Sequence, residues 1–128
     1  QKADRADPKV RAWYDAAAPH DLFLSVLVIG EIRQGIERLR RRDPIQAERL
    51  EQRLTLIKAN FADRILPVST AVAERWGRNN VPDQLPVIDG LLAATAQEHG
   101  LTLVTRNERD VERSGVLVLN PFSDATTP

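Results

Sequence analysis

Short, mostly apolar runs alternate with helical stretches along the chain, and this alternation limits the fold more than any other feature. Such runs stand at residues 22–26, 101–104 and 116–119, and their length is typical of buried strands. Between them, apolar residues recur at the spacing of helices that bury one face. Strands that alternate with helices favour an α/β sandwich with a mostly parallel sheet.

Pairs of aspartate and proline mark the starts of two helices. Asp7-Pro8 and Asp43-Pro44 each place a capping side chain before a proline at the first helical position. The second pair follows an earlier helix closely and so predicts an αα-hairpin. We expect the helix after Asp43 to bury one face, made of Ile45, Leu50, Leu54, Ile57 and Phe61.

Other boundaries can be placed from single residues. A strand is expected to pass directly into a helix near Ser25, and Ser69 or Thr70 caps a later helix. Pro86 opens a helix over residues 87–99, and Gly100 is its expected C-terminal stop. The following segment, 105–115, is polar and rich in turn residues.

Composition excludes several kinds of site. A chain of 128 residues that is 42% hydrophobic fits one compact domain over residues 1–128. Cysteine is absent and there are two histidines, so a metal site would have to use oxygen ligands. The absence of cysteine also favours a reducing, cytoplasmic setting. No apolar run resembles a membrane span or a signal peptide.

Charge is balanced, with 18 basic and 18 acidic side chains. Proteins that hold nucleic acid by bulk charge are usually basic, so this chain would need a local basic patch. Arginines at positions 38, 40, 41 and 42 are the best candidate. Cations near a helix C-terminus are also stabilising in themselves, which is the plainer explanation of the cluster.

Three acidic residues stand where apolar or small neighbours dominate. Glu31 lies early in the helix after the first strand, Asp89 opens the helix after Pro86, and Asp110 follows the strand 101–104. Each has an ordinary explanation: a solvated helix residue, a favourable charge in a first helical turn, or a turn residue. Together they all fall after strands or at helix starts, where the ligands of parallel sheets gather. Clustered carboxylates in a chain with no cysteine and only two histidines suit Mg²⁺ or Mn²⁺.

At these residues the sequence resembles the PIN-domain family, and within it the VapC and FitB-like toxins of type II toxin–antitoxin systems. The resemblance covers essentially the whole chain. It rests on Glu31 in the segment 25–31, on the block 85–89 with the small residues that follow Asp89, and on the segment 101–107 together with Asp110. The last two motifs are the specific ones.

The resemblance implies a three-layer α/β sandwich and an endoribonuclease that cuts single-stranded regions of RNA, often transfer RNA. Glu31, Asp89 and Asp110 would be the catalytic, metal-binding acids, and Thr105 and Asn107 polar helpers. Arg106 and Arg109 flank the site and could hold substrate phosphates. A cognate VapB-like antitoxin and a homodimer are implied as partners. The family's first acid, in an Asp-Thr-Asn motif that ends an N-terminal strand, has no counterpart in these residues, so that strand is expected upstream of Gln1.

Two alternatives to a PIN-domain ribonuclease stay open. Another Mg²⁺-dependent phosphoryl-transfer hydrolase would need an active-site lysine, and Lys2, Lys9 and Lys58 are poorly placed for that role. A non-catalytic or inactive PIN-fold module for binding or dimerisation would keep the fold without the chemistry.

Overall fold

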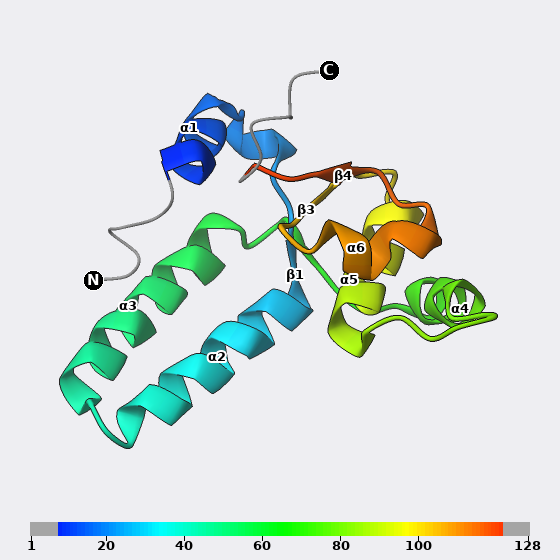
Figure 1. Cartoon of the computed structure of the whole chain (residues 1–128). Helices are drawn as coiled ribbons and strands as arrows, with labels where there is room; N and C mark the ends of the chain where they lie inside the picture. Colours follow the sequence, from blue (N-terminus) through cyan, green and yellow to red (C-terminus); the bar gives the residue numbers. More distant parts are fainter. Residues whose placement is uncertain (1–7, 122–128) are drawn as a thin grey trace. The chain divides into compact units, whose positions relative to one another are not determined.

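The computed structural model describes residues 8–121. These residues divide into two compact units, which we describe separately. The hairpin unit is Phe23–Val68, and the two-segment unit comprises residues 8–22 and 69–121. Figure 1 labels the helices and strands of both.

The hairpin unit contains β1 (Leu24–Ser25), α2 (Val26–Arg40), α3 (Pro44–Asn60) and β2 (Ile65–Leu66). Helices α2 and α3 run side by side, joined by a tight turn (Figure 1). The Asp43 side chain accepts a hydrogen bond from the Gln46 amide at 3.1 Å, with Pro44 at the first helical position. The predicted αα-hairpin and this cap are therefore confirmed, as is the direct passage from strand to helix at Ser25.

The core of the hairpin unit differs in one residue from the expected face of α3. Leu54 and Ile36 are each 1% exposed and Ala47 is fully buried. Ile45, which we expected in this face, is 71% exposed, so that prediction was wrong. At about 100° per residue, position 45 lies opposite position 54 on the helix, whereas position 47 lies almost in line with it.

The two-segment unit begins with α1 (Pro8–Ala16) and the short 3₁₀ helix η2 (Pro19–Asp21), and resumes with α4 (Thr70–Asn79) and α5 (Val87–Glu98). Its C-terminal part contains β3 (Leu103–Val104), α6 (Glu108–Val111), the 3₁₀ helix η3 (Glu112–Ser114) and β4 (Val118–Leu119). Ser69 caps α4, and its side chain accepts from the Val72 amide at 3.2 Å. Gly100 follows α5 with a φ of 64°, which suits glycine at a helix stop.

Small residues make α5 the buried helix of this unit. Ala93 and Ala94 are fully buried, Thr95 is 4% exposed and Ala96 is 6% exposed. Side chains of this size let neighbouring elements approach closely, and α5 packs against α4, β3, α6 and η3. The helix that carries Asp89 is thus held from several sides.

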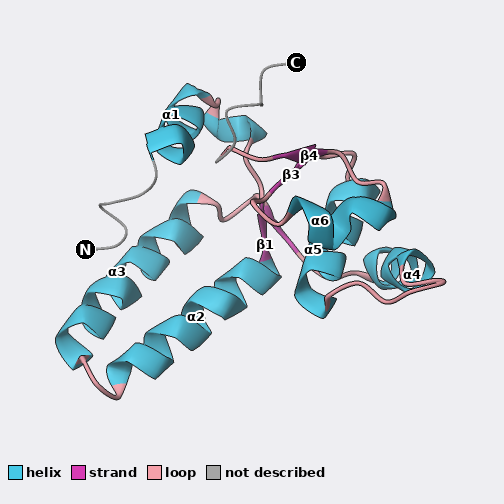
Figure 2. Ribbon diagram, in the orientation of Figure 1, coloured by secondary structure: helices cyan, strands magenta, loops and turns pink. Residues whose placement is uncertain are grey.

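All of the strand pairing among the described residues is parallel (Figure 2). Leu24 pairs with Ile65 in the hairpin unit, and Leu103 pairs with Val118 in the two-segment unit. Parallel strands between helices confirm the expected α/β class. The strands are shorter than the apolar runs suggested, and the polar segment 105–115 contains α6 and η3 rather than turns alone.

The predicted cap at Asp7 lies outside the described residues. None of the helices in the described part of the chain combines the length and the hydropathy needed to cross a bilayer.

Candidate functional site

Glu31 lies in the second turn of α2, shortly after β1 ends. The start of this helix is held by Ser25, which is 8% exposed and whose hydroxyl accepts a hydrogen bond from the Leu27 amide at 3.0 Å. Glu31 itself is exposed. Among residues 8–121 its carboxylate has no hydrogen bond or ion pair, so it is available to a ligand from solvent.

Asp89 lies in the first turn of α5, and it is half-buried. A carboxylate here is stabilised by the helix dipole and by backbone amides that lack helical partners. Next to it, Gly90 leaves room for the indole of Trp76 on α4. A Cβ atom at position 90 would lie 3.3 Å from two atoms of that ring. The close packing of α4 on α5 therefore sets the position of the turn that carries Asp89.

Asp110 lies on α6, which follows β3 after a short loop. The helix is anchored by Val111, which is 1% exposed, while the Asp110 side chain is exposed. The Thr105 hydroxyl accepts a hydrogen bond from the Asn107 amide at 3.0 Å, so Thr105 shapes the loop. Asn107 occupies the cap position of α6 without a capping hydrogen bond from its side chain.

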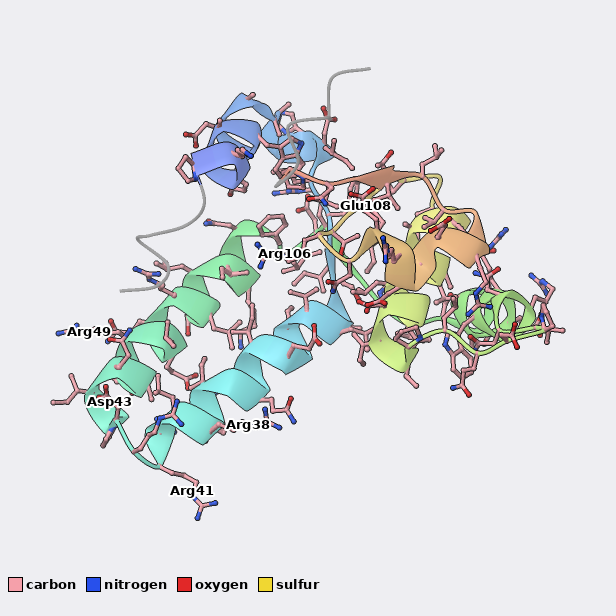
Figure 3. The ribbon with its side chains drawn as sticks, viewed as in Figure 1. Arg38, Arg41, Asp43, Arg49, Arg106 and Glu108 are labelled. Carbon is pink, nitrogen blue, oxygen red and sulfur yellow. The ribbon has the colours of Figure 1, made fainter. Side chains whose placement is uncertain are left out.

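Arg106 and Arg109, the candidate phosphate contacts, are both exposed. Arg106 lies in the loop after β3 and Glu108 begins α6 (Figure 3). The Glu108 carboxylate accepts a hydrogen bond from the Asn120 side chain at 2.7 Å. This bond links α6 to the residue that follows β4.

Hydrogen bonds that the sequence did not suggest join the segments around Asp89 and Asp110. The Gln97 side chain of α5 accepts from Asn79 of α4 and donates to the Ser114 carbonyl of η3, each at 2.7 Å. Arg113 donates to the carbonyl oxygens of Asp83 at 2.9 Å and Gln84 at 3.3 Å. The loop before α5 and the turn after α6 are thereby tied together.

The sequence contains a signal for the hydrogen bonds of Gln97. Gln97 is a polar side chain at the end of a helix built from small and apolar residues, and such a residue usually needs a hydrogen-bonding partner. Arg113 has no comparable sequence signal, because its acceptors are backbone carbonyls about 30 positions earlier.

The three acids belong to both units. Asp89 and Asp110 lie in the two-segment unit, on helices α5 and α6 that pack together, and Glu31 lies in the hairpin unit. Within residues 8–121, no group of three or more acidic, histidine or cysteine side chains forms a metal-binding cluster. The chemistry of the donors, carboxylates alone, fits Mg²⁺ or Mn²⁺ rather than a metal that prefers nitrogen or sulfur ligands. The metal-binding role of the three acids stays a prediction.

Known proteins resemble the chain over most of its length. It is 32% identical to toxin FitB of Neisseria gonorrhoeae, and the match covers 91% of this chain and 86% of that protein. It is 30% identical to a VapC ribonuclease of Sinorhizobium fredii, covering 93% of this chain and 88% of the relative.

Solved structures show the same fold. The crystal structure of FitAcB from Neisseria gonorrhoeae matches with a TM-score of 0.84 and 31% identity, over 91% of this chain and 86% of that one. A toxin–antitoxin complex from Klebsiella pneumoniae matches with a TM-score of 0.70 and 25% identity, over 93% and 88%. The profile of the PIN domain matches residues 3–115, a span that includes both units. The chain therefore belongs to the PIN-domain family.

Proposed function

We propose that this protein is a Mg²⁺- or Mn²⁺-dependent endoribonuclease toxin that cuts single-stranded regions of RNA, with transfer RNA as a candidate substrate. The observation that carries the proposal is the PIN-domain match over residues 3–115, together with relatives named as a toxin and as a VapC ribonuclease. The positions of the acids agree with it, because each lies on a helix that follows a strand or opens with an apolar segment.

Glu31, Asp89 and Asp110 are proposed to hold the cation, with the chain acting as a single PIN-like domain over residues 1–128. When bound, a divalent cation lowers the pKa of a coordinated water and polarises a phosphoryl oxygen. Carboxylates beside such a water can take up its proton. Asp89 is the central candidate because its helix is the most buried in its unit and is therefore rigidly held.

The remaining site residues are assigned to binding and orientation. Thr105 and Asn107 shape the loop that leads to Asp110, so they would position that carboxylate. Arg106 and Arg109 are exposed beside the same loop, and their guanidinium groups suit contacts with phosphate oxygens. The chain offers no histidine in this segment, so the proposed proton transfers involve carboxylates.

A cognate VapB-like antitoxin is the proposed protein partner. The support is the similarity to a Klebsiella pneumoniae toxin–antitoxin complex over 93% of this chain. Antitoxin binding would neutralise the ribonuclease, and the active form is proposed to be a homodimer in the cytoplasm.

The substitution Asp89→Asn tests the proposal. It keeps the size of the side chain and removes the negative charge, so we expect RNA cleavage to fall by at least about a hundredfold, as for other single catalytic acid or base groups. Cleavage is measured with the full-length protein on a transfer RNA in Mn²⁺ buffer, and unfolding by urea checks that the fold is intact.

The matched control is Asp83→Asn, since Asp83 is an exposed acid in the loop just before α5. Its side chain lies 4.0 Å from Arg113, whose hydrogen bonds go to backbone carbonyls that the substitution leaves in place. Undiminished cleavage by Asp89→Asn, or cleavage in excess EDTA, would contradict the metal-carboxylate mechanism. Folded wild-type protein that binds antitoxin and never cleaves RNA would support a non-catalytic module instead.

A further inference from the structure

Basic charge is concentrated in the hairpin unit of this neutral protein. Residues 23–68 contain nine lysines and arginines but six acids, whereas the chain as a whole contains 18 of each. The rest of the chain therefore has a surplus of acids. A polyanion approaching the molecule would be attracted to the hairpin unit rather than to the surface as a whole.

An ion-pair network uses two of the acids of this unit and two of its arginines. Arg33 donates to both carboxylate oxygens of Glu51, at 2.6 and 2.7 Å, and Arg40 donates to Glu51 at 2.9 Å. Both arginines also bind Glu37, at 3.0 and 3.1 Å. These contacts neutralise Arg33 and Arg40 within the protein.

Three other acids of the hairpin unit, two of them near the turn, also contact other residues. Glu48 lies 4.0 Å from Arg40, and the Asp43 side chain caps α3 through Gln46. Asp63 lies 3.5 Å from Arg64 at the far end of α3. Four arginines around the turn are left without an ion pair to any residue between 8 and 121, and all four are exposed; we call them the tip arginines: Arg38, Arg41, Arg42 and Arg49.

Three of the tip arginines point in different directions instead of converging on one point. Arg38 points outward from α2, Arg49 points outward from α3, and Arg41 extends away from the turn between them (Figure 3). A small anion would need several donors aimed at one place. Spread cations suit a polymer whose negative charges repeat along its length.

The same surface offers little to a protein partner. Between residues 38 and 49, Ile45 is the one large hydrophobic side chain that is strongly exposed, at 71%. Protein interfaces usually have a buried centre of aromatic and apolar residues. Charge complementarity thus favours nucleic acid over protein at this end of the hairpin.

We infer that the tip arginines contact the phosphate backbone of the RNA substrate, as a binding surface additional to the loop arginines Arg106 and Arg109. The inference rests on the proposed ribonuclease function for the identity of the polyanion. Contacts of this kind position the substrate without reading its sequence. They would allow a neutral protein to hold RNA through one locally basic end.

RNA binding by the double variant Arg41→Gln/Arg49→Gln tests the inference. The full-length protein is titrated into a short fluorescein-labelled single-stranded RNA in EDTA, which prevents cleavage, and anisotropy is measured at several salt concentrations. Each lost phosphate contact lowers the steepness of log K against log salt by about 0.7 for single strands, so the expected decrease is about 1.4. The dissociation constant should rise roughly tenfold or more at low salt.

The matched control is Lys58→Gln/Arg78→Gln, which removes the same charge from exposed positions outside the segment 38–49. Arg78 has only a 4.0 Å contact with Glu74, so little structure is lost. We expect the control to bind with nearly wild-type affinity and salt dependence. Equal losses in the two variants, or no loss in either, would overturn the inference.

Two further outcomes separate this inference from the proposed function. If wild-type protein binds RNA through the tip arginines but never cleaves it, the ribonuclease proposal is contradicted and the inference about the tip arginines is supported. If wild-type protein cleaves RNA and the tip variant binds RNA as tightly as the control, the inference about the tip arginines is contradicted and the ribonuclease proposal is supported. A tip variant that releases a co-expressed antitoxin while keeping its RNA affinity would assign the surface to a protein and so overturn the inference.

Discussion

Different interactions stabilise the hairpin unit and the two-segment unit, each considered by itself. In the hairpin unit a small apolar core around Leu54 is accompanied by a partly exposed ion-pair network of Arg33, Arg40, Glu37 and Glu51. In the two-segment unit the buried residues of α5 are small, and α4 is linked to α5 by one ion pair, Arg75 to Glu98, and by the neutral hydrogen bond from Asn79 to Gln97. Ion pairs in both units keep part of their side chains in solvent, which limits the cost of desolvating the charges. The difference is that four charged side chains form one network in the hairpin unit, whereas α4 and α5 share a single ion pair.

The largest expected effect concerns the core of the hairpin. Leu54→Ala should lower the free energy of unfolding by about 2–5 kcal/mol, the usual range when a buried leucine is truncated. Leu56→Ala is the control, because Leu56 lies two positions away on the same helix and is 62% exposed. It should cost about 0.5 kcal/mol or less. Urea denaturation measures both, and similar losses would contradict the assigned core face.

An intermediate effect concerns the packing of α4 on α5. Gly90→Ala places a Cβ atom 3.3 Å from the Trp76 ring, so either the ring or the two helices must move by a few tenths of an ångström. Gly77→Ala is the control, since nothing lies within 4 Å of a Cβ atom at that position. Alanine in an open helical position usually stabilises by about 0.5–1 kcal/mol.

We therefore expect Gly90→Ala to be less stable than Gly77→Ala by about 1–3 kcal/mol, the range for overpacked sites. RNA cleavage should also decrease in Gly90→Ala, because Asp89 precedes the shifted residue. Thermal unfolding and cleavage assays of the two variants are the measurements. Equal stability would show that Trp76 can move without cost.

The smallest effect concerns the ion-pair network. Hydrogen bonds from Arg33, and then from Arg40, lower the pKa of Glu51 to about 2, below the ordinary value of about 4.3. A carboxyl with a lowered pKa in the folded state stabilises the fold fully above its unfolded pKa, and this stabilisation is lost as the pH falls toward 2. Salt should weaken it, because these side chains are partly exposed to solvent.

The variant Glu51→Gln cannot be ionised, so wild-type protein should be more stable than this variant at pH 6 to 7, roughly neutral conditions. The difference should shrink as the pH falls from about 5 to about 2. Glu48→Gln serves as the control, since Glu48 has only a 4.0 Å contact with Arg40. A difference that stays constant with pH would show that the network does not act through the ionised carboxylate.

Helix boundaries were the part of the fold that could be read most directly from the sequence. Asp43 and Ser69 cap their helices through bonds to amides three residues ahead, and Gly100 ends α5. These signals are local, so nearby residues suffice to interpret them. Ile45 alone was assigned wrongly to the buried face of α3, because its apolar character suggested burial although its helical angle places it opposite Leu54.

The candidate site was predicted only in part. Glu31 and Asp89 lie on the helices expected for them, whereas Asp110 lies on α6 rather than in a turn. The joint role of the three acids as metal ligands stays a prediction. The polar links made by Gln97 and Arg113 were missed, because their partners lie 17 to 30 positions away in the sequence.

The sequence by itself determined the alternation of helices and strands, the helix caps, and the motifs that indicated the PIN-domain family. Each of these depends on neighbouring residues or on a recurring pattern. Only the tertiary structure decided which arginines are neutralised by Glu37 and Glu51, and which remain exposed around the turn. Those outcomes depend on side chains brought together from distant positions, and the spacing of charges along the chain does not specify their partners.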